Sequence, residues 1–209
     1  MSNKSLKLKN MSKKIKLTIN GDIYELPKSA LVLKGSTQWE DETYIQMRAK
    51  YCSSIIKQYV KKNYPSLKVW ATSSVYSGGS SCDIYVSNQD GSKVDSSIFD
   101  KISEWKQTLQ GGNFNGMIDM YESREDSPTT DAGTPMKYFP SYVFIDNKPK
   151  WGTVEYWVNQ YNEYKENISN PDWSEMVNII NNKFGGSFLE YNKTYMSKKE
   201  YDNCSKVLA

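Results

Sequence analysis

Alternation of apolar and polar residues is the first regular pattern along the chain. It covers residues 14–26, KIKLTINGDIYEL, and is interrupted by Asn20-Gly21. Asn-Gly adopts positive φ at both central positions of a turn, which a two-residue hairpin loop requires. The pattern therefore predicts a tight β-hairpin, whose second strand ends at Pro27 because proline has no backbone N–H to donate.

A three-to-four spacing of apolar residues follows over residues 36–65 and predicts an amphipathic helix. The stripe is formed by Ile45, Arg48, Cys52, Ile55, Ile56, Tyr59 and Val60. Thr37 and Glu40 have capping-box spacing, so Thr37 is the expected N-cap. Pro65 ends the helix.

Period-two alternation then predicts two strands, at residues 67–76 and 82–86, joined by the segment 77–81. Residues 94–110 predict a second helix, capped by Asp95 or Ser96. Gly111-Gly112 is expected to end that helix in the left-handed conformation. Residues 113–124 predict a third strand.

The C-terminal third contains three further predicted elements: a strand at 138–146, a helix at 172–184 and a last strand at 187–195. Together these patterns predict an α+β fold, an antiparallel sheet with two main helices packed on one face. Residues 1–36 form a basic N-terminal arm with the β-hairpin. Residues 37–209 form a single α+β domain with a helical aromatic insertion at about 147–170.

Composition restricts the function more than it defines it. The chain has 209 residues, a net charge of +3, three cysteines without CxxC spacing and no histidine. The absence of histidine removes the commonest general base and the commonest metal ligand. No apolar run reaches the roughly 18 residues of a membrane span. We therefore expect a cytoplasmic, non-enzymatic protein, without cofactor or metal and without a membrane partner.

Lysines are concentrated at the N-terminus, and they suggest either a solvated arm or a phosphate-binding one. They are Lys4, Lys7, Lys9, Lys13, Lys14 and Lys16. If the arm binds nucleic acid, affinity must fall steeply as salt rises, because binding releases counterions. The protein would then be a nucleic-acid binding module that uses this arm and exposed aromatic residues.

The sequence YSGGSS has two interpretations. It comprises Tyr76, Ser77, Gly78, Gly79, Ser80 and Ser81. Consecutive backbone N–H groups with flexible glycines form anion-binding nests. Phosphate loops, however, lie between a strand and a helix and carry a lysine, whereas this segment joins two predicted strands. A hairpin bend is therefore the first interpretation, and a phosphate (anion) contact or an oligomer contact the second.

Two further sets of residues are candidates for function. Asp83 and Asp119 lie on strands predicted to be neighbours, with Glu122 further along the strand of Asp119. Two carboxylates on a sheet either hold Mg²⁺ or act as an acid–base pair, so that Asp83, Asp119 or Tyr76 would serve a histidine-free enzyme, or they belong to a polar outer face. The insertion is rich in aromatic residues, and a helix capped by Thr153 would place them on one stripe. Either that stripe packs on its own domain, or it binds a partner protein or unpaired bases. The partner-binding candidates are Trp151, Tyr156, Trp157, Tyr161 and Tyr164.

The hairpin, the Asp-Gly turn and the following strand, in this order, resemble the large polyvalent protein-associated domain numbered twenty-nine. The resemblance covers roughly residues 40–188. The matching residues are Tyr76, Ser77, Gly78, Gly79, Ser80, Ser81, Asp90, Gly91, Phe114, Gly116, Met117 and Asp119.

The resemblance implies a protein of phages or conjugative elements, where the family occurs in long polyvalent proteins that travel with invading DNA. It provides no catalytic residues. We therefore expect an accessory protein that inhibits a host defence system, of the anti-CRISPR or anti-restriction type, by stoichiometric binding to a nuclease complex. The sequence leaves the oligomeric state open.

Overall fold

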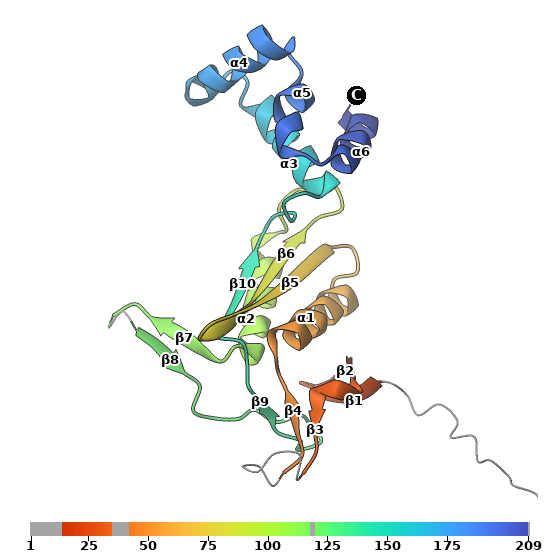
Figure 1. The fold of residues 1–209 in the computed structure, drawn as a ribbon, viewed down its shortest axis with the longest axis vertical. Coiled ribbons are helices and arrows are strands. Elements are labelled where there is room, and N and C mark those ends of the chain that lie inside the picture. The colour runs from red at the N-terminus through yellow and green to blue at the C-terminus, as the bar shows by residue number, and fades with distance from the viewer. Residues whose placement is uncertain (1–13, 35–41, 118–119, 209) are drawn as a thin grey trace, which may run out of the picture. The chain divides into compact units, whose positions relative to one another are not determined.

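The computed structural model describes residues 14–34, 42–117 and 120–208 (Figure 1). The α+β class is confirmed, with the strands distributed over four small sheets. The chain divides into two compact units. Unit 1 contains the residues up to 59 together with 71–83 and 103–144, and unit 2 contains 60–70, 84–102 and 145–209.

The predicted N-terminal hairpin is confirmed. Strands β1 (Lys14–Ile19) and β2 (Asp22–Pro27) pair antiparallel around Asn20-Gly21. Both turn residues have positive φ, 52° at Asn20 and 79° at Gly21. The Gly21 N–H also donates to Asp131 Oδ2 at 2.9 Å, so the turn is held by a residue 110 positions away.

The predicted first helix begins later than its apolar spacing indicates. Residues Tyr44–Gln46 form strand β4, between β3 (Leu31–Val32) and β9 (Met136–Lys137), and helix α1 is Ala49–Asn63. The Ile45 N–H donates to the Pro135 carbonyl at 2.8 Å, so pairing with a distant segment overrides the local helical pattern. Thr37 and Glu40 lie outside the described residues.

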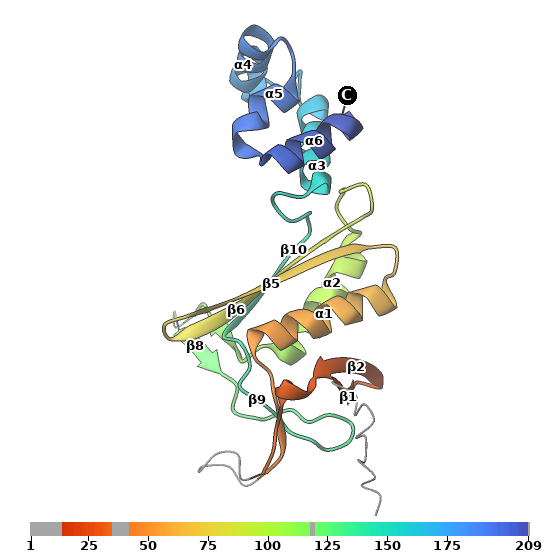
Figure 2. The same cartoon turned by 45° about the vertical axis from the view of Figure 1, so that its right-hand side comes forward.

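Strands β5 (Lys68–Tyr76), β6 (Gly79–Ser87) and β10 (Tyr142–Asp146) form one sheet in the order β10-β6-β5. The predicted inward residues Cys82, Ile84 and Val86 are buried. Helix α1 contacts this face through Ser53 Oγ, which donates to the Thr72 carbonyl at 3.0 Å. Figure 2 shows α1 and α2 (Ser96–Lys106) on the same side of the sheet.

Asp95 rather than Ser96 caps α2, because its carboxylate accepts the Ser97 N–H at 2.9 Å. Hydrogen bonds from Ser97 lower the pKa of this carboxyl. The expectation of a left-handed helix end at Gly111-Gly112 is wrong, since neither glycine has a positive φ. After a 3-10 turn, the chain enters strand β7 (Gly112–Asn115).

The predicted third strand is a hairpin. Strand β7 pairs antiparallel with β8 (Met120–Ser123) in a two-stranded sheet of its own, with Gly112 opposite Ser123. A β-carbon at Gly112 would lie 2.0 Å from the Glu122 carbonyl oxygen. Glycine is therefore needed there for close backbone approach and not for its conformation.

Unit 2 contains four helices in its C-terminal part: α3 (Val154–Glu166), α4 (Ser174–Phe184), α5 (Phe188–Asn192) and α6 (Lys198–Leu208). The predicted last strand is wrong, because Ser187 Oγ accepts the Glu190 N–H at 3.2 Å and starts α5. Ser197 and Glu200 cap α6 reciprocally, at 2.6 and 3.3 Å. No helix of the described ranges is long and apolar enough to span a bilayer.

Candidate functional site

The YSGGSS segment is a hairpin bend. Ser77 and Gly78 form the loop between β5 and β6, with Gly78 at φ 86°, and Gly79 already belongs to β6. A β-carbon at Gly79 would lie 2.9 Å from Cε2 of Tyr76 and 3.0 Å from Ser141 Oγ. The second glycine therefore makes room for the Tyr76 ring, an arrangement in which an aromatic side chain covers a strand glycine. An anion contact at Ser77, Ser80 or Ser81 stays a prediction.

The Tyr76 ring belongs to a row of exposed rings that the sequence did not reveal. Tyr142 and Phe144 alternate along β10 with the buried Val143, and their rings stack at 5.7 Å with an interplanar angle of 9°. Tyr76 lies on the same sheet, and a β-carbon at Gly79 would approach both its ring and Ser141, the residue before Tyr142. The three side chains are 46%, 36% and 54% exposed. We call Tyr76, Tyr142 and Phe144 the aromatic sheet face; all three lie in unit 1.

The opposite face of this sheet is the covered one. Ser53 of α1 contacts Cys82 on β6, and Lys106 Nζ of α2 donates to the Val143 carbonyl. Rings placed on a rigid, backed sheet lose little conformational freedom when a partner covers them. The alternation of large apolar residues around Val143 was the signal in the sequence, but it does not show which side α1 and α2 cover.

The aromatic insertion is helical, as predicted, and Thr153 is its N-cap. Its hydroxyl oxygen accepts the Tyr156 N–H at 3.3 Å. Three rings meet at this end of α3: Trp151 lies 5.0 Å from Tyr156 and 5.1 Å from Trp157 between ring centroids. Trp157 is buried and its Nε1 has no hydrogen-bond partner in the described part of the chain. Trp151 remains 56% exposed.

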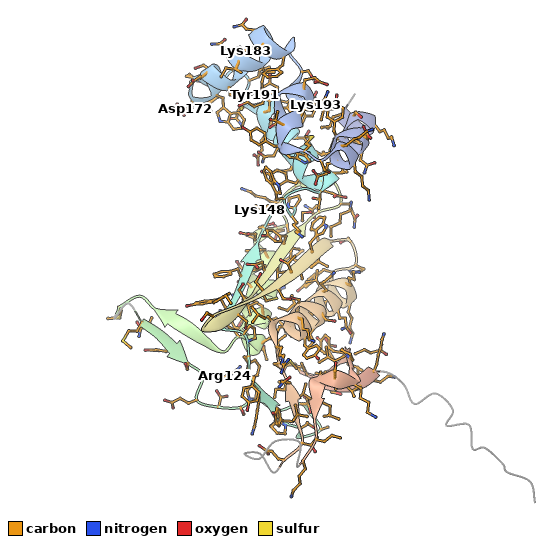
Figure 3. All side chains as sticks on the ribbon, in the orientation of Figure 1. Arg124, Lys148, Asp172, Lys183, Tyr191 and Lys193 are labelled. Carbon is orange, nitrogen blue, oxygen red and sulfur yellow. The ribbon has the colours of Figure 1, made fainter. Side chains whose placement is uncertain are left out.

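The far end of α3 packs on its own unit. Tyr164 is buried, and its ring lies 5.3 Å from that of Phe188 in α5. Tyr161 is half-buried and lies against the same cluster, as does Tyr191, which Figure 3 labels in the α4–α5 region. Of the five predicted partner-binding residues, Trp157 and Tyr164 are thus core residues of unit 2. Contact of a partner with Trp151, Tyr156 or Tyr161 stays a prediction.

The structure describes Asp83 and Glu122 among the predicted acidic residues, so the predicted pair of Asp83 with Asp119 stays a prediction. Asp83 lies on β6, between β5 and β10, whereas Glu122 lies on β8 in a separate sheet. Glu122 accepts a hydrogen bond from Asn115 Nδ2 at 2.7 Å. Asp119 lies outside the described residues. Within the ranges that the structure describes, no three Cys, Asp or Glu side chains gather as metal ligands.

The lysine arm is described only at its end. Lys14 and Lys16 lie on β1, and Lys14 Nζ forms an ion pair with Glu25 at 2.9 Å. That contact with Lys14 holds the pKa of the Glu25 carboxyl below its usual range. Lys4, Lys7, Lys9 and Lys13 lie outside the described residues.

A polar cavity of about 500 Å³ lies in unit 1, between the end of α2 and the β7–β8 hairpin. Arg124, labelled in Figure 3, lines it. Its Nε donates to Asp126 at 3.1 Å, its Nη1 donates to the Thr108 carbonyl at 3.0 Å, and its guanidinium lies 5.3 Å from the Phe139 ring centroid. These contacts attach the end of α2 to β8, so the arginine has a structural role at this cavity.

The three cysteines are buried free thiols. Cys82 Sγ lies 2.9 Å from Ser53 Oγ, and burial raises the pKa of this thiol to about 11, from an ordinary value of 9.0. Burial likewise raises the pKa of Cys52 well above its ordinary value. Neither thiol has the lowered pKa of a nucleophilic cysteine.

The raised pKa of Cys82 predicts an alkaline loss of stability. The unfolded thiol ionises near pH 9 and the folded one near pH 11, so the folded state holds the extra proton between these values. Its contribution is complete below pH 9 and is lost as pH rises to about 11. Urea unfolding at pH 8, 10 and 11 should show a steeper decline in the wild type than in Cys82→Ala. Equal declines would contradict the prediction.

A family model described as Large polyvalent protein associated domain 29 matches residues 47–156, more than half of the chain. The matched range contains α1, the β5–β6 hairpin, the Asp90-Gly91 turn, α2, the β7–β8 hairpin and β10. Comparison with curated proteins and with solved structures found no match.

Proposed function

Because the chain belongs to the family of large polyvalent protein associated domain 29, we propose that it is an accessory protein of a phage or mobile element that counteracts a host defence system. It acts by binding a host nuclease complex, of the CRISPR or restriction type, in a stoichiometric ratio. The resemblance of its motifs to domains that accompany invading DNA supports this proposal, since such proteins meet these complexes first.

The aromatic sheet face is the observation that carries the proposal. Exposed, rigidly held aromatic side chains are the commonest energetic anchors of protein interfaces. Phe144 is 54% exposed and stacks on Tyr142, so a partner surface would cover two ring faces at once. Binding through rings needs no reactive group, in agreement with a chain that contains no histidine.

The test is affinity purification of the tagged full-length protein from infected host cells, followed by mass spectrometry and nucleic-acid extraction. We expect subunits of one nuclease complex in a stoichiometric amount, and protection of incoming phage DNA when the protein is expressed. Recovery of no nuclease, together with no protection, would overturn the proposal. Recovery of nucleic acid alone, in a salt-sensitive manner that depends on residues 1–13, would support the lysine arm instead.

Phe144→Ala should weaken binding to the purified nuclease complex about 10- to 30-fold, because truncating an aromatic anchor at the centre of an interface costs about 1.4–2 kcal/mol or more. Tyr195→Ala is the matched control, since this ring is 61% exposed and belongs to unit 2, whereas the aromatic sheet face belongs to unit 1. Titration calorimetry with both variants measures the difference. If the two variants bind equally well, the aromatic sheet face is not the interface.

A further inference from the structure

Strand β5 lies at the edge of its sheet among the strands that the structure describes. In the sheet order β10-β6-β5, its only neighbour among the described strands is β6. The two-residue loop at Ser77-Gly78 pairs Tyr76 with Gly79, and hydrogen-bonded positions then alternate along an antiparallel pair. The backbone N–H and C=O groups of Val69, Ala71, Ser73 and Val75 therefore point away from β6, toward the edge.

This edge differs from the other strand edges of the described residues. Those edges are short, as in β3 and β9 with two residues each, or carry charged side chains, as β1 does with Lys14 and Lys16. Short or charged edges are how proteins avoid strand-to-strand association. Strand β5 has nine residues, and the sequence from Val69 to Cys82 contains no charged side chain.

The distal half of β5 is also open to solvent. Residues 73–76 are all exposed, and Val75 is 84% exposed, the second highest value among the large apolar side chains of the described residues. A β-branched apolar residue this exposed on a strand gains free energy when a neighbouring strand covers it.

We propose that β5 pairs antiparallel with β5 of a second copy of this chain, around a two-fold axis at Ser73. Ser73 is one of the four residues whose backbone groups face the edge, and it lies in the exposed distal half of β5. This axis places Ser73 opposite the partner's Ser73, and Ala71 opposite the partner's Val75. The shared sheet then continues across both copies.

Charge argues for a second copy over an unrelated strand. A two-fold axis brings each residue near its own equivalent, so any charge close to the axis meets a like charge. Like charges directly opposite each other on paired strands are destabilising. The run from Val69 to Cys82 is uncharged, so no like charges meet across the axis. Pairing with an unrelated strand would not require β5 to be uncharged.

The contact is small. Pairing about six residues a side covers less surface than the roughly 1,600 Å² of a standard interface. We therefore expect a reversible dimer with a dissociation constant on the order of 10 µM.

Sedimentation velocity of the full-length protein, from about 1 to about 200 µM, tests the proposal. The wild type should shift from monomer to dimer within this range. Ser73→Lys and Ser73→Glu should each remain monomeric, because like charges face each other across the axis, and an equimolar mixture of the two should dimerise again. Ser127→Lys, at an exposed serine of unit 1 outside β5, should behave as the wild type. Melting temperatures confirm that the variants are folded.

A wild type that stays monomeric at every concentration would overturn the proposal, as would a dimer that both Ser73 variants retain. Failure of the mixture to dimerise would exclude the axis at Ser73. None of these measurements involves a host protein, so the result is independent of the proposed counter-defence function.

Discussion

Replacing Gly91 with alanine is expected to lower the free energy of unfolding by about 3 kcal/mol. Two effects add at this position. Gly91 has φ 88°, which costs an L-residue about 1–2 kcal/mol. A β-carbon there would also lie 2.5 Å from the Glu155 carbonyl oxygen in the first turn of α3, and backbone cannot move away as a side chain can. The Asp90-Gly91 turn and the start of α3 would have to separate.

Gly133→Ala isolates the first of these effects. Gly133 has φ 76°, but a β-carbon there would have no atom within 4 Å. We therefore expect a loss of only about 1 kcal/mol for this variant. Urea unfolding of both variants gives the difference directly. Equal losses would mean that the approach of Glu155 contributes nothing, and that conformation alone requires glycine at position 91.

Gly112→Ala should also cost about 3 kcal/mol, for a steric reason alone. Gly112 has no positive φ, and a β-carbon there would lie 2.0 Å from the Glu122 carbonyl oxygen across the β7–β8 ladder. The hairpin must shift its register or open. The adjacent hydrogen bond from the Arg124 N–H to the Gly111 carbonyl, at 2.6 Å, should be lost with it.

Amide hydrogen exchange distinguishes this local opening from general destabilisation. In Gly112→Ala the amide of Arg124 should exchange faster, while amides of α4 such as Ile180 keep their protection. Gly185→Ala is the control: Gly185 has φ 58°, and a β-carbon there would have no atom within 4 Å, so this variant should leave the β7–β8 amides unchanged. Unchanged exchange at Arg124 in Gly112→Ala would contradict the steric interpretation.

Local signals in the sequence predicted several elements correctly. Asn20-Gly21 identified the first hairpin, Thr153 the start of α3, and the alternation around Ile84 the buried face of β6. Each of these depends on residues within a few positions of one another. The same kind of signal was present but missed at Ser187 and Glu190, whose capping-box spacing starts a helix where alternation suggested a strand.

Other features could not be predicted because they depend on distant partners. Ile45 continues a helical stripe in the sequence, yet it lies in β4 because its backbone N–H bonds to Pro135. The Gly111-Gly112 pair indicates a helix end, whereas the close approach of Glu122 is what requires the second glycine. Asp83 and Glu122 were expected on neighbouring strands, but strand pairing assigns them to different sheets.

The candidate interface likewise combines features that the sequence shows with features that only the tertiary structure shows. The sequence alone shows that aromatic residues are abundant, that histidine is absent and that β5 carries no charge beyond its first residue. The exposure of Phe144 depends on which sheet face α1 and α2 cover, and the burial of Tyr164 depends on its packing against Phe188, so both became known only from the folded chain. Short-range backbone geometry is encoded within a turn or two of chain, whereas burial depends on segments far apart in the sequence.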